Sequence, residues 1–164
     1  GQILEVICGM CQGQQINGHK FENVATTQVL TTTYQNVTGS SISYAPPAGT
    51  KRVEYEFYTH WTYESGSAIG SCKLFVDDVE VLYARISPWG GDKKMSFKWV
   101  FECAAAADDT NYGAFTSWTK PKSIKWMMRE YSGSHDVTIH NTHYWDGSAG
   151  DHFSAPYLKL TAYS

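Results

Sequence analysis

The sequence has few charged residues and no excess of positive charge. Asp, Glu, Lys and Arg make up 18% of its 164 residues, below the roughly 25% of an average soluble domain. The formal net charge is -3, so no positive field would attract a phosphate backbone or an anionic lipid surface. We therefore expect neither nucleic acid nor a membrane surface as a partner.

Long apolar segments are absent as well. No segment approaches the roughly 20 apolar residues that cross a bilayer, and the N-terminus lacks the basic, apolar and small-residue regions of an export signal. We expect no membrane insertion.

Residues 1–164 match one domain, since domains usually hold roughly 100–200 residues. Gly1 suggests a chain excised from the C-terminus of a longer protein.

Helix signals are scarce, and strand signals replace them. Only residues 104–107, four alanines, favour a helix, and Asp108 and Asp109 follow too soon for more than a turn. Between residues 51 and 61, by contrast, apolar and polar residues alternate strictly. A period of two is typical of a strand with one buried and one wet face, so we predict an all-β fold.

The same reasoning predicts nine or ten strands in a two-sheet antiparallel β-sandwich of jelly-roll type. Asp77 and Asp78 separate two of these strands and suit a tight hairpin, because Asp tolerates positive φ. The predicted strands are residues 3–8, 28–34, 41–44, 51–61, 72–76, 79–85, 94–101, 123–131, 135–142 and 158–162. The predicted loops are residues 63–70, 87–92, 104–118 and 144–155.

The cysteines do not form a metal-binding or redox pattern. Cys8 and Cys11 have C-x-x-C spacing, but Cys72 and Cys103 stand alone far downstream, whereas four-cysteine zinc sites come as two close pairs. A strand before the C-x-x-C also lacks the helix N-terminus that would lower a thiol pKa. We expect free thiols, and a bridge between Cys72 and Cys103 remains open.

Six histidines raise the question of a metal. His140, His143 and His152 lie near Asp146 and Asp151 in the sequence, but zinc requires three or four donors converging at about 2 Å. Our expectation is no metal and no cofactor. These histidines would instead form hydrogen bonds in a loop or line a subunit contact, and the pKa of His140 or His143 would lie near neutral pH.

Motifs of acyl or phosphoryl transfer are missing. Neither G-x-S-x-G, H-E-x-x-H nor G-x-x-x-x-G-K occurs, so we predict no enzyme. A carboxylate pair for cleaving glycosides stays open as the weaker alternative. Its candidates are Glu54 or Glu56 with Asp108, Asp109, Asp146 or Asp151.

Several blocks, in fixed order along almost the whole chain, carry a family resemblance. They are residues 1–6, residues 36–44 running into Pro46 and Pro47, and residues 73–81, 97–99, 123–125, 129–131 and 145–147. With these blocks the chain resembles the C-terminal tip domains of trimeric tail fibres from marine-type bacteriophages and related fibre-like adhesins of bacteria. The resemblance implies a trimeric β-sandwich knob on a long stem, in a virion tail fibre or on a cell surface.

The predicted loops hold aromatic and acidic residues that the resemblance does not cover. Flat aromatic rings can stack on sugars while carboxylates accept hydroxyl hydrogens. Trp61 has an alternative role, because it continues the buried face of its strand. The candidate ligand-binding residues are Trp61, Tyr63, Trp89, Asp92, Tyr112, Tyr144, Trp145, Asp146 and His152.

These residues predict a receptor-binding tip of a homotrimeric fibre that recognises a cell-surface glycan or another envelope component. A trimer would present three equal sites, and several weak contacts made at once would give a high overall affinity for the cell surface. Two alternatives remain: a structural cap that only holds the trimer together, and an enzyme that trims surface polysaccharide.

Overall fold

The computed structural model describes residues 1–164, apart from the side chain of Ala149. Its described residues form strands and no helix, and every pairing between the named strands is antiparallel. The all-β prediction is therefore confirmed. Among the described residues, no helix has the length and apolar character needed to cross a bilayer.

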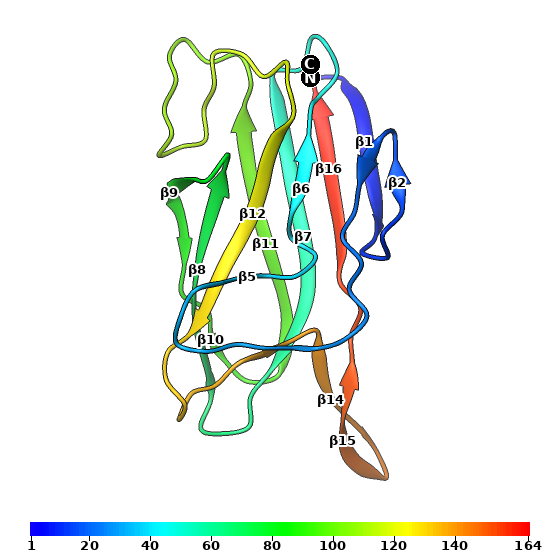
Figure 1. The fold of residues 1–164 in the computed structure, drawn as a ribbon, viewed down its shortest axis with the longest axis vertical. Helices are drawn as coiled ribbons and strands as arrows, with labels where there is room; N and C mark the ends of the chain where they lie inside the picture. Colours follow the sequence, from blue (N-terminus) through cyan, green and yellow to red (C-terminus); the bar gives the residue numbers. More distant parts are fainter.

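The first sheet is built around the long strand β7. Its order is β1-β16-β7-β13-β4, and β11 pairs with β7 along the other edge (Figure 1). The strands of this sheet are β1 (Ile3–Met10), β4 (Gln28–Val29), β7 (Arg52–Thr62), β11 (Lys93–Glu102), β13 (Thr138–Ile139) and β16 (Tyr157–Tyr163).

The second sheet has β8 and β12 at its centre. Its order is β10-β8-β12-β5, with β9 paired to β8 and β6 paired to β12. Its strands are β5 (Gln35–Asn36), β6 (Ile42–Tyr44), β8 (Ala68–Val76), β9 (Val79–Ile86), β10 (Trp89–Gly90) and β12 (Lys122–Glu130). Two separate hairpins complete the fold: β2 (Gln15–Ile16) with β3 (His19–Lys20), and β14 (Asn141–Asp146) with β15 (Ser148–Phe153).

The core lies between the two sheets. Alternate residues of β7 point into it, and Tyr55, Phe57 and Trp61 are fully buried, as the alternation predicted. Phe97 of the first sheet meets Trp126 of the second edge-to-face, with ring centroids 5.1 Å apart. Aromatic pairs in this geometry stabilise a core beyond their buried area.

The predicted hairpin at Asp77 and Asp78 is confirmed, because both residues have positive φ and Val76 pairs with Val79. Three predicted strands are wrong in length. The strand predicted at 72–76 begins at Ala68, so the end of the predicted loop 63–70 belongs to β8. The segment 28–34 keeps its strand only to Val29, since the Thr31 hydroxyl accepts the Thr33 amide in a local turn. The segment 135–142 becomes a strand only at Thr138, and it is interrupted at His140, whose φ is +61°, before β14 begins at Asn141.

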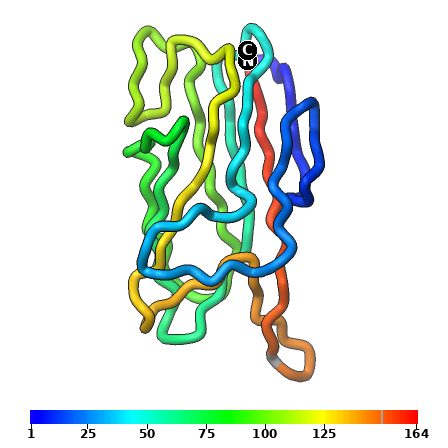
Figure 2. Tube along the Cα trace, viewed as in Figure 1, coloured from blue at the N-terminus to red at the C-terminus, as the bar shows by residue number. Residues whose placement is uncertain are grey.

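The predicted loop 144–155 is also wrong, because this segment is the hairpin of β14 and β15. Gly147, with φ of +83°, supplies the turn between the two strands. The hairpin extends beyond the sandwich at the end opposite the two chain termini (Figures 1 and 2).

All four cysteines are free. Cys8 is exposed, while burial raises the pKa of Cys11 and of Cys103 to about 12. A thiol with such a pKa is not a reactive thiolate at neutral pH. The structure thus shows neither a bridge between Cys72 and Cys103 nor a reactive C-x-x-C pair among the described residues.

His140 is a neutral residue of the core. Its Nε2 lies 2.8 Å from the Thr38 hydroxyl and its Nδ1 2.5 Å from the Thr59 hydroxyl, so two hydroxyls satisfy both ring nitrogens. Burial lowers its pKa from 6.5 to about 4. The expectation that His140 titrates near neutral pH is therefore wrong, because burial disfavours the charged ring.

The buried His140 makes stability depend on pH. Its pKa is lower in the folded than in the unfolded chain, so the unfolded chain takes up the proton first as the pH falls below 6.5. We expect its contribution to the free energy of unfolding to be complete above pH 6.5 and to fall by at most about 3 kcal/mol as the pH approaches 4. Denaturant unfolding of the unmodified protein and of His140→Asn measures this.

Asn tolerates the positive φ of this position, and the two proteins are otherwise identical. The difference between the two stability curves should therefore shrink as the pH falls from 6.5 to 4. Parallel curves over this range would contradict the neutral buried histidine.

Candidate functional site

Several segments that are distant in the sequence meet at the end of the sandwich that carries the β14–β15 hairpin. They are the connection after β7, the strand β10 with the connection to β11, the segment before β13, and the hairpin itself (Figure 1). The carboxylate of Asp136 accepts the backbone amides of Glu64 and Ser65 and so fixes the connection after β7.

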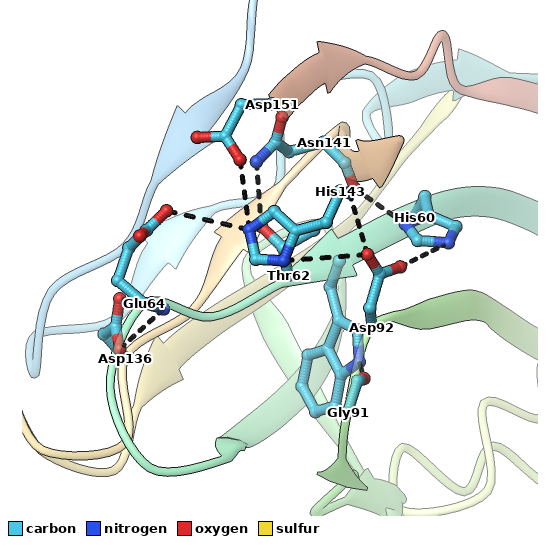
Figure 3. A network of polar contacts seen from close by, with 10 residues as sticks. His60, Thr62, Glu64, Gly91, Asp92, Asp136, Asn141, His143 and Asp151 are labelled. Atoms are coloured by element: carbon cyan, nitrogen blue, oxygen red, sulfur yellow. Dashed lines mark hydrogen bonds and ion pairs between the residues drawn. The ribbon is translucent and has the colours of Figure 1, made fainter. Parts of the chain in front are cut away.

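Asp92, in the connection between β10 and β11, joins strand β7 to the hairpin (Figure 3). Its Oδ2 accepts the backbone amide of His143 at 2.8 Å, and its Oδ1 lies 2.9 Å from Nε2 of His60. Nδ1 of His60 donates to the Asn141 carbonyl at 2.7 Å. Both ring nitrogens of His60 thus face oxygen atoms, one of the Asn141 carbonyl and one of the Asp92 carboxylate. Asp92 and His60 together attach the hairpin to the sandwich.

A buried amide strengthens this attachment. Asn141 is 2% exposed, and its side chain donates to the Thr62 hydroxyl at 2.8 Å. The base of the hairpin is therefore part of the core, although the rest of the hairpin is exposed.

His143 lies between two carboxylates on the outer side of the same network. Its Nε2 is 3.0 Å from Oδ1 of Asp151 and 3.7 Å from Oε1 of Glu64 (Figure 3). On the other side of the ring, Nδ1 is 3.8 Å from Oδ2 of Asp92. Three carboxylates surround one imidazole, so this region is strongly acidic.

Three large aromatic side chains at this end are exposed to solvent. Trp89 is 68% exposed, Tyr144 58% and Trp145 72%. The indole N–H of Trp89 donates to the Ser67 hydroxyl at 3.1 Å, which holds the ring in one orientation. Exposed ring faces can stack on a sugar ring, while carboxylates at the same end accept its hydroxyl hydrogens.

The structure brings together most of the predicted ligand-binding residues. Tyr63 is half-buried beside His143, with ring centroids 6.4 Å apart. Asp146 is exposed at the end of β14. His152 lies beside Tyr144, with centroids 6.0 Å apart, and its Nδ1 donates to the Phe153 carbonyl. These three residues share one end with Trp89 and Asp92.

Two of the predicted residues do not belong to this group. Trp61 is fully buried, and its indole N–H donates to the Gly91 carbonyl at 2.7 Å, so its ring faces are covered and it supports the site from the core. Tyr112 lies in the connection between β11 and β12, toward the opposite end, where it packs against Tyr83. Because β11 runs away from the hairpin end, the connection after it cannot contribute to the site.

The sequence did not identify Glu64, His60 or the pairing of His143 with Asp151 as parts of one site. The pairing follows from a turn at Gly147, because residues four before and four after the turn face each other across the hairpin. His60 stands near the end of the predicted strand 51–61 and Glu64 in the predicted loop 63–70, but nothing in the sequence connects them to His143.

Comparisons with known proteins identify no family for this chain. No family model matches the chain, and no curated protein matches it. A solved chain from infectious bursal disease virus, Gx strain, is similar over 96% of this chain, with 13% sequence identity and a TM-score of 0.41. The match covers 32% of that viral chain.

We expect the substitution Asp92→Ala to loosen the hairpin. The His143 amide loses its acceptor and His60 loses its charged partner, which should lower the free energy of unfolding by roughly 1–2 kcal/mol. Hydrogen exchange at residues 141–146 should become faster. Asp146→Ala, which removes an exposed carboxylate from the same hairpin, serves as the control. Equal exchange in both variants would show that Asp92 does not hold the hairpin.

Proposed function

We propose that this chain is a receptor-binding tip domain of a fibre, of jelly-roll type and assembled as a homotrimer, that binds a carbohydrate on a cell surface. The observation that carries the proposal is the joint exposure of Trp89, Tyr144 and Trp145 at one end of the sandwich. Large exposed aromatic groups on a folded surface mark interaction sites, and no covalent chemistry is needed for this role.

The position of the termini supports the proposal. The N- and C-termini lie together at the end opposite the hairpin (Figure 2), and the Ser164 amide donates to the Gln2 carbonyl. A stem that joins at residue 1 would therefore place the aromatic end at the distal tip. This is the position from which a fibre meets a target cell.

An exposed apolar row supports the assembly. On β1, the outward side chains of Leu4, Val6 and Met10 are 37%, 43% and 38% exposed. The row continues at Tyr157 of the neighbouring β16, which stacks on Tyr58 of β7. Burying such a face between copies removes apolar area from water, and a threefold ring would then present three equal sites.

Weak contacts are sufficient in such an assembly. A millimolar sugar contact corresponds to about 4 kcal/mol, and tethering several of them raises the overall affinity by roughly a hundredfold or more. The shallow, exposed site suits this mode of binding better than a deep pocket would.

The enzyme alternative places catalysis at a concave surface. One such surface, of about 650 Å³, is lined partly by Lys20, Glu22, Asn23 and Ser41, and Glu22 is the one carboxylate among its lining residues. A smaller one, of about 240 Å³, is lined partly by Asp77 and Asp108. Cleavage of a glycoside requires two carboxylates. Release of sugar fragments from capsular polysaccharide would establish this alternative.

We expect Val6→Lys to break the assembly without unfolding the chain, because Val6 faces solvent on the sheet surface. The mass in solution, three times 18.4 kDa for the proposed trimer, should fall to that of one chain. Val79→Lys is the matched control, since Val79 of β9 is 49% exposed away from this face. A single-chain mass for the unmodified protein would remove the trimer from the proposal.

We expect Trp89→Ala and Trp145→Ala each to weaken carbohydrate binding about fivefold, the effect of losing roughly 1 kcal/mol of stacking. Binding of the intact oligomer is measured on an array of bacterial surface glycans. Tyr83→Ala, which removes a 55% exposed ring from β9, is the control.

Undiminished binding by both tryptophan variants would exclude stacking at this end. An array that stays blank for the intact oligomer would favour the structural cap.

A further inference from the structure

Glu64, His143 and Asp151 bring three possible metal-binding atoms to one point. One carboxylate oxygen of each acid and one ring nitrogen of the histidine all lie within 4.8 Å of one another. Donors bound to one tetrahedral zinc ion at about 2.0–2.1 Å stand roughly 3.3 Å apart. The distances from Nε2 of His143, 3.0 Å to Asp151 and 3.7 Å to Glu64, bracket this value.

The charges around His143 are not balanced by protein cations. Asp92 has His60 as its partner at 2.9 Å. Among the described residues, Glu64 and Asp151 form ion pairs with His143 and with no lysine or arginine. The two carboxylates together carry a charge of minus two, which a divalent cation neutralises.

Asp92 lies on the other side of the His143 ring. Its Oδ2 is 3.8 Å from Nδ1 of His143, and the same oxygen accepts the His143 backbone amide at 2.8 Å. A cation bound at Nε2 would leave the ring proton on Nδ1, on the side of Asp92, and metal-binding histidines commonly have a carboxylate on that side of the ring.

We propose that Glu64, His143 and Asp151 form a binding site for a divalent transition-metal ion of the zinc type. One imidazole nitrogen and two carboxylate oxygens are donors that zinc accepts, whereas calcium takes oxygen ligands alone. The side chains of Glu64, His143 and Asp151 are 64%, 34% and 57% exposed, so the ion can enter and water can complete its coordination.

The site joins two segments of the candidate functional end. Glu64 belongs to the connection after β7, while His143 and Asp151 face each other across the hairpin. A bound ion would therefore fix the hairpin that carries Tyr144 and Trp145 to the sandwich. The metal site does not depend on carbohydrate binding, since its ligands and its test are independent of the glycan.

The test is calorimetric titration of the protein of residues 1–164 with zinc chloride at pH 7.5, after removal of metals with a chelator. All proteins carry Cys8→Ser, because the exposed Cys8 thiol could bind zinc by itself. We expect one ion per chain. Glu64→Gln, His143→Gln and Asp151→Asn should each weaken binding by at least tenfold, a typical effect of changing a metal site.

Two matched variants control for charge and for a histidine outside the site. Asp78→Asn removes an exposed carboxylate whose partner is Lys125, and His19→Gln changes the histidine of β3. Neither should alter zinc affinity by more than twofold. Thermal unfolding gives a second measurement, in which zinc should raise the Tm of the controls but not of the three ligand variants.

Substitution with cobalt(II) reports the ligands directly through its visible absorption. Intense bands of a four-coordinate ion should appear with the Cys8→Ser protein and disappear with His143→Gln. The proposal is overturned by an absence of zinc binding below millimolar concentration, by full binding in His143→Gln, or by calcium binding that needs the two carboxylates but not the histidine.

Discussion

The alternation of buried and exposed residues along β7 is the constraint on which the rest of the structure depends. This strand pairs with β11 on one edge and with β16 and β13 on the other, so a shift of one residue would turn every side chain of β7 to the wrong face. The register that buries Trp61 also turns its neighbour His60 outward. The core and the candidate site are thus fixed by the same strand.

Residues that repeat with a period of two were predictable from the sequence because one face of their strand is buried. The hairpin of β14 and β15 was not, since Tyr144 and Trp145 are neighbours and both are exposed. A two-stranded hairpin with both faces exposed to solvent has no alternation of apolar and polar residues, so its strands cannot be recognised in the sequence. The place of Tyr112 could have been corrected by following the chain, because antiparallel strands send successive connections to alternate ends of the sandwich.

Contacts between distant segments were the least predictable part of the site. Glu64 and His143 are brought together only because β7 ends beside the base of the hairpin, where Asn141 bonds to Thr62. Asp92 was identified as a candidate from its acidic side chain in a predicted loop, but its two histidine partners arise from the tertiary fold. The proposed function depends on this arrangement. The base of the hairpin is buried in the core, and it supports the exposed aromatic rings at the end opposite the termini.

Hydrogen exchange of the intact oligomer, with and without a bacterial surface carbohydrate that it binds on an array, tests the central claim most directly. The account predicts slower exchange in residues 63–67, 89–92 and 141–153, with little change elsewhere. Protection centred instead on Lys20, Glu22 and Ser41, at the concave surface away from the hairpin, would contradict it.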